Sequence, residues 1–182
     1  MIDPAGLPAL RTRRLLLRPL RLADAPAIAE MLGDPRVSRG LIHVPHPFPP
    51  GAAEQWIRGR LDTGEARFAI TRRNAVIGTV GLRVVARHQH AELGYWLGVD
   101  HWGEGYATEA AAAAVTWGFK ARLLQRIYGQ YLGDNHASGR VMEKIGMLRE
   151  GVRRQHYRKG KRWYDVHQFG ILREDDTWRT RS

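Results

Sequence analysis

The order of strand-like and helix-like segments predicts an α+β fold: a mixed, mostly antiparallel twisted sheet with helices on both of its faces. Two pairs of segments carry apolar residues at alternate positions around a short turn, which is typical of antiparallel hairpins. These pairs are Arg67–Thr71 with Ala75–Arg83, and Leu148–Gln155 with Tyr164–Leu172. Between them, Ala91–Ala121 has the pattern of a strand, a glycine-rich turn and a helix of small residues.

Length and composition predict one domain. The chain has 182 residues, 43% of them hydrophobic and 26% charged, and we expect a single domain over 1–182 with its core at about 12–173. No apolar run approaches the roughly 18 residues of a membrane-spanning helix. Without cysteine there is no disulfide or thiolate metal site, and His90, His101 and His136 lack a metal-ligand spacing, so no metal is expected. A cytoplasmic location fits best.

The chain is strongly basic, with a net charge of +11 from 29 Lys and Arg against 18 Asp and Glu. Positive residues gather at Arg11–Arg21 and at Arg149–Arg162, where aromatic residues lie between the cations. This composition suits contact with RNA, which stays open as a partner. We prefer the simpler interpretation that Arg149–Arg162 is an exposed hairpin with solvated arginines.

The N-terminal segment predicts a strand followed by a short helix. Thr12–Leu20 is a strand pattern that Pro19 ends. Asp24 before Pro26 predicts a capped helix start, and Gly33 predicts its end.

A proline-rich loop, His43–Gly51, precedes a second predicted helix from Ala52 to about Leu61. His43 and Phe48 in this loop are candidate contacts for the acceptor substrate, and Tyr164 on the second hairpin is a third. The prolines explain the loop equally well as a rigid connection.

The central strand carries a carboxylate inside the sheet. Its two faces hold Ala91, Leu93, Tyr95 and Leu97 on one side, and Glu92, Gly94 and Trp96 on the other. Glu92 is therefore a candidate general base, acting directly or through a water. An ion pair with one of the many arginines would also explain it.

The turn after this strand predicts an anion cradle. Gly98, Gly103 and Gly105 let backbone N–H groups turn toward one point before a helix N-terminus. The helix has small residues on one side, so it can lie close to the sheet: Ala107, Ala110, Ala111, Ala114 and Gly118. A turn without a ligand is the alternative, whereas the G-x-G-x-x-G dinucleotide fingerprint and the P-loop Gly-Lys-Ser/Thr are absent.

The C-terminal third adds a strand, a helix and the second hairpin. Gln125–Leu132 is a strand pattern, and Ala137–Ile145 is a helix pattern that Gly146 ends. The polar tail Arg173–Ser182 is expected to fray, with Trp178 able to pack.

The loop Trp102–Ala107 resembles motif A of the GNAT acetyltransferases, whose pattern is Gln/Arg-x-x-Gly-x-Gly/Ala. Trp102 stands at the Gln/Arg position, a departure that affects a side-chain contact to the cofactor but not the backbone amides. The run GYATEA before an alanine-rich helix is similar to the branch that acetylates ribosomal-protein N-termini. The element order from Leu15 to Arg173 is also similar to the family, which implies a GNAT-like sheet with a splayed central strand.

This resemblance implies acetyl-CoA as co-substrate. The amides of the loop would bind its pyrophosphate, and the splayed strand end Leu97–Val99 would pair with the pantetheine amides. The residues implied in these two segments are Leu97, Gly98, Val99, Trp102, Gly103, Glu104, Gly105, Tyr106, Ala107 and Thr108. The resemblance leaves a homodimer open.

A second motif, N-x-x-S-x-R-V-x-E-K-x-G from Asn135, closely resembles the one with which the family's N-terminal acetyltransferases hold pantetheine and protonate the leaving thiolate. It implies that Asn135 and Lys144 bind the cofactor and that Ser138 both binds it and acts as the catalytic acid. The family also implies Glu92 as base. A simple helix cap at Asn135 and a solvated Lys144 are the alternatives. Tyr131 is an alternative acid, although its position in the alternating strand pattern, in line with Ile127 and Gly129, favours packing in the core.

The sequence therefore predicts an acetyl-CoA-dependent N-acetyltransferase that acts on a primary amine, with a protein or peptide N-terminus of the ribosomal-protein kind preferred. A small amine, such as a polyamine, aminoglycoside or amino-acid analogue, is the alternative, although few acids occur at Ile42–Gly51 to bind a polycation. A non-catalytic acyl-CoA-binding or RNA-binding module is the alternative from another class. The sequence contains no G-x-S-x-G nucleophile elbow, which argues against a hydrolase.

Overall fold

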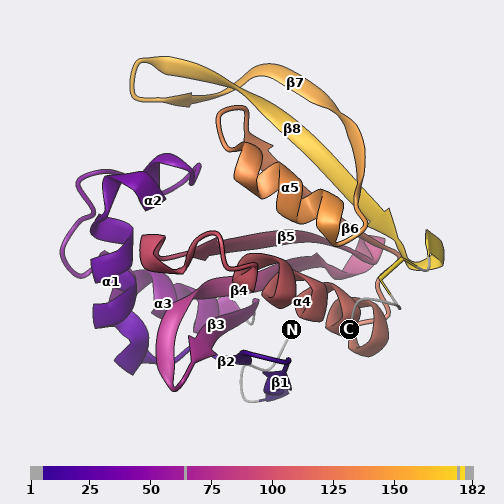
Figure 1. Ribbon diagram of the computed structural model, residues 1–182, viewed down its shortest axis with the longest axis horizontal. Coiled ribbons are helices and arrows are strands. Elements are labelled where there is room, and N and C mark those ends of the chain that lie inside the picture. The colour runs from indigo at the N-terminus through magenta and orange to yellow at the C-terminus, as the bar shows by residue number, and fades with distance from the viewer. Residues whose placement is uncertain (1–5, 64, 176, 179–182) are drawn as a thin grey trace.

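A computed structural model describes residues 6–63, 65–175 and 177–178 (Figure 1). Its described residues form one sheet in the order β1-β2-β3-β4-β5-β6-β8-β7. Neighbouring strands are antiparallel except β5 and β6, which are parallel. The strands are β1 (Leu10–Arg11), β2 (Leu16–Pro19), β3 (Ala66–Arg72), β4 (Ala75–Val85), β5 (His90–Leu97), β6 (Arg126–Leu132), β7 (Leu148–Lys159) and β8 (Arg162–Leu172).

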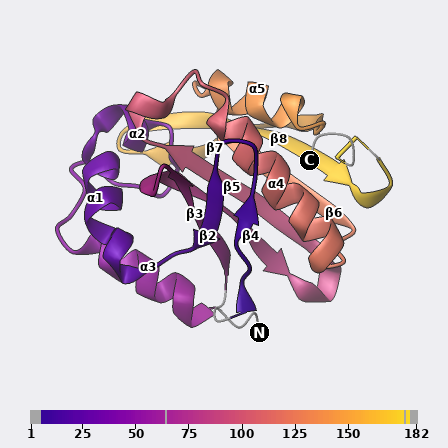
Figure 2. The same cartoon turned by 60° about the horizontal axis from the view of Figure 1, so that its bottom comes forward.

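Helices cover both faces of this sheet, as predicted. They are α1 (Ala25–Gly33), α2 (Pro35–Arg39), α3 (Ala52–Thr63), α4 (Tyr106–Ala121) and α5 (His136–Lys144), with short 3₁₀ turns at Leu22–Asp24, Ala86–His88, Val99–His101 and Arg173–Asp175. The helices α4 and α5 share one apolar core with the sheet, and α1 and α3 share the other (Figures 1 and 2). The mixed, mostly antiparallel α+β architecture is thereby confirmed.

The small residues of α4 allow the close packing that the sequence predicts. Ala110, Ala111 and Ala114 are fully buried. At Gly118, an added Cβ would lie 2.5 Å from the Leu82 Cδ1 atom, which is far inside van der Waals contact. The helix therefore rests directly on the sheet, and its N-terminus is held at the end of β5.

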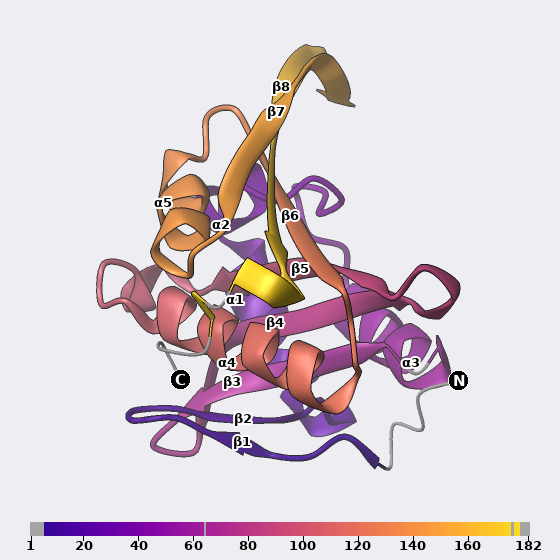
Figure 3. The ribbon, with the colours of Figure 1, turned by 90° about the vertical axis from the view of Figure 1, so that its right-hand side faces the viewer.

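The hairpins have the expected pairing. Arg73 and Asn74 between β3 and β4 both have positive φ, of 49° and 67°, which is the conformation of a two-residue type I′ turn. The second hairpin is longer than predicted, because β7 continues to Lys159. Figure 3 shows this hairpin rising above the rest of the sheet.

One N-terminal prediction needs correction, and one short helix was not predicted. Thr12–Leu20 is not one strand: Thr12 and Leu15 exchange hydrogen bonds across a turn, which splits the segment into β1 and β2. In addition, α1 ends at Gly33 as predicted, but a helix that was not predicted follows: the Asp34 side chain accepts a hydrogen bond from Arg36 N at the start of the five-residue helix α2.

The C-terminal tail is partly packed. The Trp178 side chain is 6% exposed, lies against Phe119 with ring centroids 4.9 Å apart, and donates its indole N–H to the Arg173 carbonyl oxygen. Packing of this tryptophan is thus confirmed. Fraying was expected from Arg173 to Ser182, but Arg173–Asp175 form a 3₁₀ turn. Residues 176 and 179–182 lie outside the described part of the chain.

Candidate active site

The sheet opens between its two parallel strands. β5 and β6 pair only where His90–Leu93 lies beside Arg126–Gly129, and no pairing between them is seen in the described residues beyond Leu93. Up to Leu97, β5 continues to pair with β4 on its other side. The two strands therefore form a wedge that is open toward the N-termini of α4 and α5, which is the splayed strand that the resemblance implied.

A cavity of about 600 Å³ occupies this opening, a size typical of sites for small ligands. α2, the end of β5, the loop before α4, and α5 all contribute to its wall. It brings together these predicted residues: Leu97, Trp102, Gly103, Gly105, Tyr106, Ala107, Thr108, Asn135, Ser138, Lys144 and Tyr164. The predicted residues Gly98, Val99, Glu104, Glu92, His43 and Phe48 are not part of its lining.

The loop before α4 has the geometry of an anion cradle. Gly103 and Gly105 have φ of 80° and 77°, a left-handed conformation that glycine adopts without strain. α4 begins immediately afterwards at Tyr106, so its first N–H groups and the positive end of its dipole face the cavity. The Trp102 indole N–H donates to the Leu97 carbonyl oxygen at 2.9 Å, which closes the loop back onto β5.

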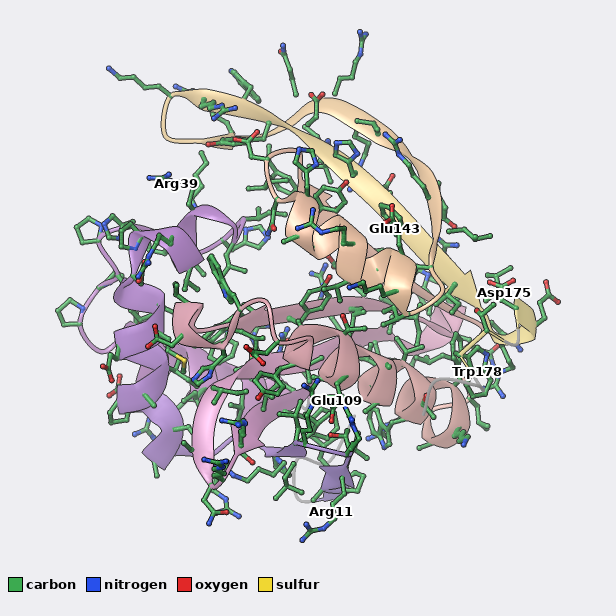
Figure 4. All side chains as sticks on the ribbon, in the orientation of Figure 1. Arg11, Arg39, Glu109, Glu143, Asp175 and Trp178 are labelled. Atoms are coloured by element: carbon green, nitrogen blue, oxygen red, sulfur yellow. The ribbon has the colours of Figure 1, made fainter. Side chains whose placement is uncertain are left out.

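A brace from the N-terminal turn holds this loop, and sequence reasoning missed it. Arg14 donates to the Glu104 carbonyl oxygen at 2.9 Å and lies 4.5 Å above the Tyr106 ring centroid. Glu109, labelled in Figure 4, accepts hydrogen bonds from Thr12 Oγ1, Arg14 N and Arg14 Nε. Burial raises the pKa of Glu109, but the hydrogen bonds from Thr12 and Arg14 outweigh it and hold that pKa below its usual value.

At the start of α5, the hydroxyl group of Ser138 lies beside that of Tyr95 from β5. Asn135 Oδ1 accepts the Ser138 backbone N–H at 3.2 Å, so Asn135 does cap the helix. The Tyr95 hydroxyl lies 2.9 Å from both Ser138 Oγ and the Ser138 carbonyl oxygen. Burial raises the pKa of Tyr95 well above its usual value, so its phenol stays protonated. The strand pattern places Tyr95 only on the apolar face of the strand, and nothing local indicates a partner 43 residues away.

Glu92 lies where the two strands part. It pairs with Arg83, and its Oε1 accepts a hydrogen bond from Gln130 Nε2 at 2.8 Å. Because side chains alternate along a strand, Glu92 projects from the face of β5 opposite to Tyr95. The ion pair weighed for this residue is therefore present, and Glu92 and Ser138 lie on opposite sides of the sheet.

The remaining candidates lie around the cavity. Tyr131 stacks on His167 with ring centroids 4.8 Å apart and lies under Gly139 of α5, which supports packing as its role. In the proline-rich loop, His43 lies edge-on to Tyr157 of the second hairpin, and Phe48 packs against the α1–α3 core. This loop and hairpin thus adjoin each other.

Residues 14–148 match the family described as acetyltransferase (GNAT) domain. The chain belongs to this family. GNAT acetyltransferases transfer an acyl group, with acetyl-CoA as their co-substrate.

Individual relatives agree with this assignment. The GNAT chain is 34% identical over 179 residues to the uncharacterized N-acetyltransferase YoaA of Bacillus subtilis, covering 91% of this chain and 97% of YoaA. It is 29% identical over 89 residues to the ribosomal-protein-serine acetyltransferase of Escherichia coli, which covers 48% and 50% of the two chains. The crystal structure of a GNAT-family acetyltransferase from Bacillus anthracis superimposes with a TM-score of 0.84 at 28% identity, covering 92% and 99%.

Two further observations concern metal sites and membrane spans in the described residues of the GNAT chain. In residues 6–63, 65–175 and 177–178, no three His, Cys, Asp or Glu side chains are grouped so that they could hold a metal ion. None of the helices described is both long and apolar enough to cross a membrane.

Proposed function

We propose that this GNAT acetyltransferase moves the acetyl group of acetyl-CoA to the α-amine of a protein or peptide N-terminus. The observation that carries the proposal is one continuous cavity that joins the loop before α4, the splayed strands and the Tyr95–Ser138 hydroxyl pair. The similarity to the ribosomal-protein-serine acetyltransferase supports a protein acceptor. A cytoplasmic site of action, where newly made protein N-termini occur, is part of the proposal.

In this proposal the loop holds the diphosphate of the co-substrate. The backbone N–H groups of Gly103, Gly105, Tyr106 and Ala107 provide hydrogen-bond donors, and α4 adds the positive end of its dipole. Trp102, Glu104 and Thr108 shape the same loop. The role of Lys144, one α-helical turn from Arg140 on α5, is to place a second positive charge near the phosphates.

The strand end Leu97, Gly98 and Val99 is proposed to pair with the amides of the pantetheine arm, as a neighbouring strand would. The Leu97 carbonyl oxygen accepts the Trp102 indole N–H with one lone pair, which leaves its second lone pair for that pairing. Asn135 contributes its side-chain amide, whose Nδ2 lies 3.4 Å from the Gly40 carbonyl oxygen on the other side of the opening.

Ser138 is proposed to donate a hydrogen bond from Oγ to the thiolate that leaves when the C–S bond breaks. A hydroxyl that donates to sulfur retains lone pairs of its own. The Tyr95 phenol, 2.9 Å away, can then turn its single proton from the Ser138 carbonyl oxygen to Ser138 Oγ. The two hydroxyls thus form a chain in which Tyr95 orients Ser138. This arrangement supplies charge-assisted hydrogen bonding where negative charge develops.

The acceptor amine requires little help to lose its proton. A free α-amine has a pKa of about 7.7–8.0, whereas a lysine side chain has about 10.4. Glu92 is proposed to accept the proton through a water, because it lies at the point of the wedge but not on the cavity wall. His43, Phe48 and Tyr164 are proposed to contact the acceptor where the proline-rich loop meets the second hairpin.

The cavity disfavours a polycationic acceptor. Asp134 is the acidic residue in its lining, and that carboxylate is paired with Arg162. A polyamine would therefore meet no unpaired carboxylate on the cavity wall that the described residues form.

The test is release of free CoA thiol from acetyl-CoA with different acceptors. A peptide with a free N-terminus should support release, while the same peptide with a blocked N-terminus should not. Faster release with a polyamine or aminoglycoside would contradict the acceptor. Thermal unfolding with acetyl-CoA provides the control: saturation at about 100 times the dissociation constant stabilises a protein by about 2.7 kcal/mol, and no stabilisation would contradict the cofactor site.

A further inference from the structure

The cavity has basic side chains at two separate ends. Its ionisable lining residues are Arg36, Arg39, His101, Asp134, Arg140 and Lys144. Arg140 and Lys144 lie on α5, which packs beside α4 and its N-terminal loop. They are thus placed to serve the phosphate end, whereas Arg36 and Arg39 belong to α2, across the opening.

At the α2 end, two of the three nearby cations are already engaged. Arg36 makes a two-pronged ion pair with Asp34. Lys159, from the tip of the second hairpin, donates to the carbonyl oxygens of Ser38 and Leu41 at 2.5 and 2.6 Å. These bonds hold the hairpin tip against the end of α2.

Arg39 is the cation left for a ligand at this end. It is exposed, it lies in the cavity wall, and it has no carboxylate partner among the described residues. Figure 4 shows it between α2 and the tip of the β7–β8 hairpin. An unpaired guanidinium in such a place favours carboxylate or phosphate groups.

The same charge affects the reacting amine. An unpaired cation such as Arg39 beside the acceptor disfavours a bound ammonium and favours the neutral amine, which is the form that attacks the thioester. It also repels an acceptor that is only positive. An acceptor with a negative group near its amine would be attracted electrostatically and still lose its proton easily.

We propose that the acceptor carries a negatively charged group close to its reactive amine, and that Arg39 binds this group. For a peptide, this is an Asp or Glu side chain in the first few residues after the N-terminus. The inference rests on the proposed function for the identity of the reaction, but the charge preference is a property of the cavity itself.

The experiment compares peptides of one sequence with Asp, Asn or Lys at the second position. At low ionic strength we expect kcat/KM to be about fivefold higher for Asp than for Asn, as for a partly exposed ion pair, and lowest for Lys. The preference should shrink in about 0.5 M salt. R39Q should abolish it and R39E should shift it toward Lys. R11Q, which removes an arginine at the opposite end of the molecule in Figure 4, should leave it unchanged.

A binding measurement separates this proposal from the proposed function. The same peptides are titrated by calorimetry into the protein saturated with CoA. Tighter binding of the Asp peptide that depends on Arg39 supports the inference even without turnover, and only the proposed reaction then fails. The same kcat/KM and affinity for Asp, Asn and Lys peptides, or an Asp preference that R39Q retains, would overturn it.

Discussion

The Tyr95–Ser138 pair offers the sharpest test of the proposed chemistry. The substitution Tyr95→Phe removes one hydroxyl from a half-buried side chain and leaves the ring in place. It deletes the contact of 2.9 Å to Ser138 Oγ and the one of the same length to the Ser138 carbonyl oxygen. Ser138 Oγ then keeps its own proton but loses the phenol that orients it.

The expected effects differ for stability and for catalysis. Loss of one buried hydrogen bond costs about 1 kcal/mol of unfolding free energy, or roughly 2–4 °C in Tm for a chain of this size. Ser138→Ala removes the proposed donor itself and should lower kcat by about 100-fold, the usual effect of losing one oxyanion-type donor. Tyr95→Phe leaves the donor but not its orientation, so we expect about a tenfold lower kcat with an unchanged KM for acetyl-CoA.

The assay is steady-state thiol release at saturating peptide, with Tyr131→Phe as the matched control. Tyr131 is a buried tyrosine under α5, but no hydrogen bond to Ser138 is made by it in the described residues. Its substitution should leave kcat within about twofold of wild type. A twofold change corresponds to about 0.4 kcal/mol of activation free energy, which is the scatter of a neutral substitution. Equal kcat values for the two variants would refute the orienting role of Tyr95, and a loss confined to Tyr131→Phe would transfer the acid role to Tyr131.

Three further predictions concern the base, the loop and the fold. Glu92→Gln should lower kcat at neutral pH without changing acetyl-CoA affinity, and the loss should shrink above about pH 8, where an α-amine is already neutral; an unchanged rate at pH 7 would remove Glu92 from the mechanism. Gly105→Ala places a side chain at φ of 77° beside the proposed phosphate site, so calorimetry should show weaker acetyl-CoA binding; full affinity would argue against the cradle. Burial raises the pKa of Asp24, but hydrogen bonds from Arg18 and the Arg21 N–H outweigh burial and hold that pKa below its usual value. The ionised carboxylate therefore stabilises the fold above about pH 4, and this stabilisation is lost as the pH falls further. Asp24→Asn should therefore lower the unfolding free energy by about 3 kcal/mol at pH 7, and the deficit should diminish toward pH 3; a deficit independent of pH would show that the ion pair is not its cause.

The sequence was informative where local periodicity records which face is buried. Alternation over Ala91–Leu97 and small residues from Ala107 predicted β5, α4 and the turn between them, and the structure confirms both elements and the close packing at Gly118. The polar start of α5 could be predicted equally well, because Asn135 is a cap residue whose partner, Ser138 N, lies three positions later.

Contacts between distant segments could not be predicted from the sequence in this way. Tyr95 has the same alternating phase as Leu93 and Leu97, so the pattern could not distinguish a packed ring from a phenol that reaches Ser138. The helix α2 is too short for a periodic signal, although Asp34 before Pro35 is a helix-start pair. The contact of Lys159 with the end of α2 spans 118 to 121 residues and depends on how the hairpin bends over the sheet.

The most direct measurement of the proposed reaction uses one peptide that contains both a free α-amine and an internal lysine. It is incubated with acetyl-CoA and the protein at pH 7, and fragmentation mass spectrometry locates the added acetyl group. The proposed function predicts an acetyl group on the α-amine alone, formed in step with thiol release, and a strongly reduced yield with Ser138→Ala. Acetylation of the lysine side chain, or thiol release without an acetylated peptide, would contradict it.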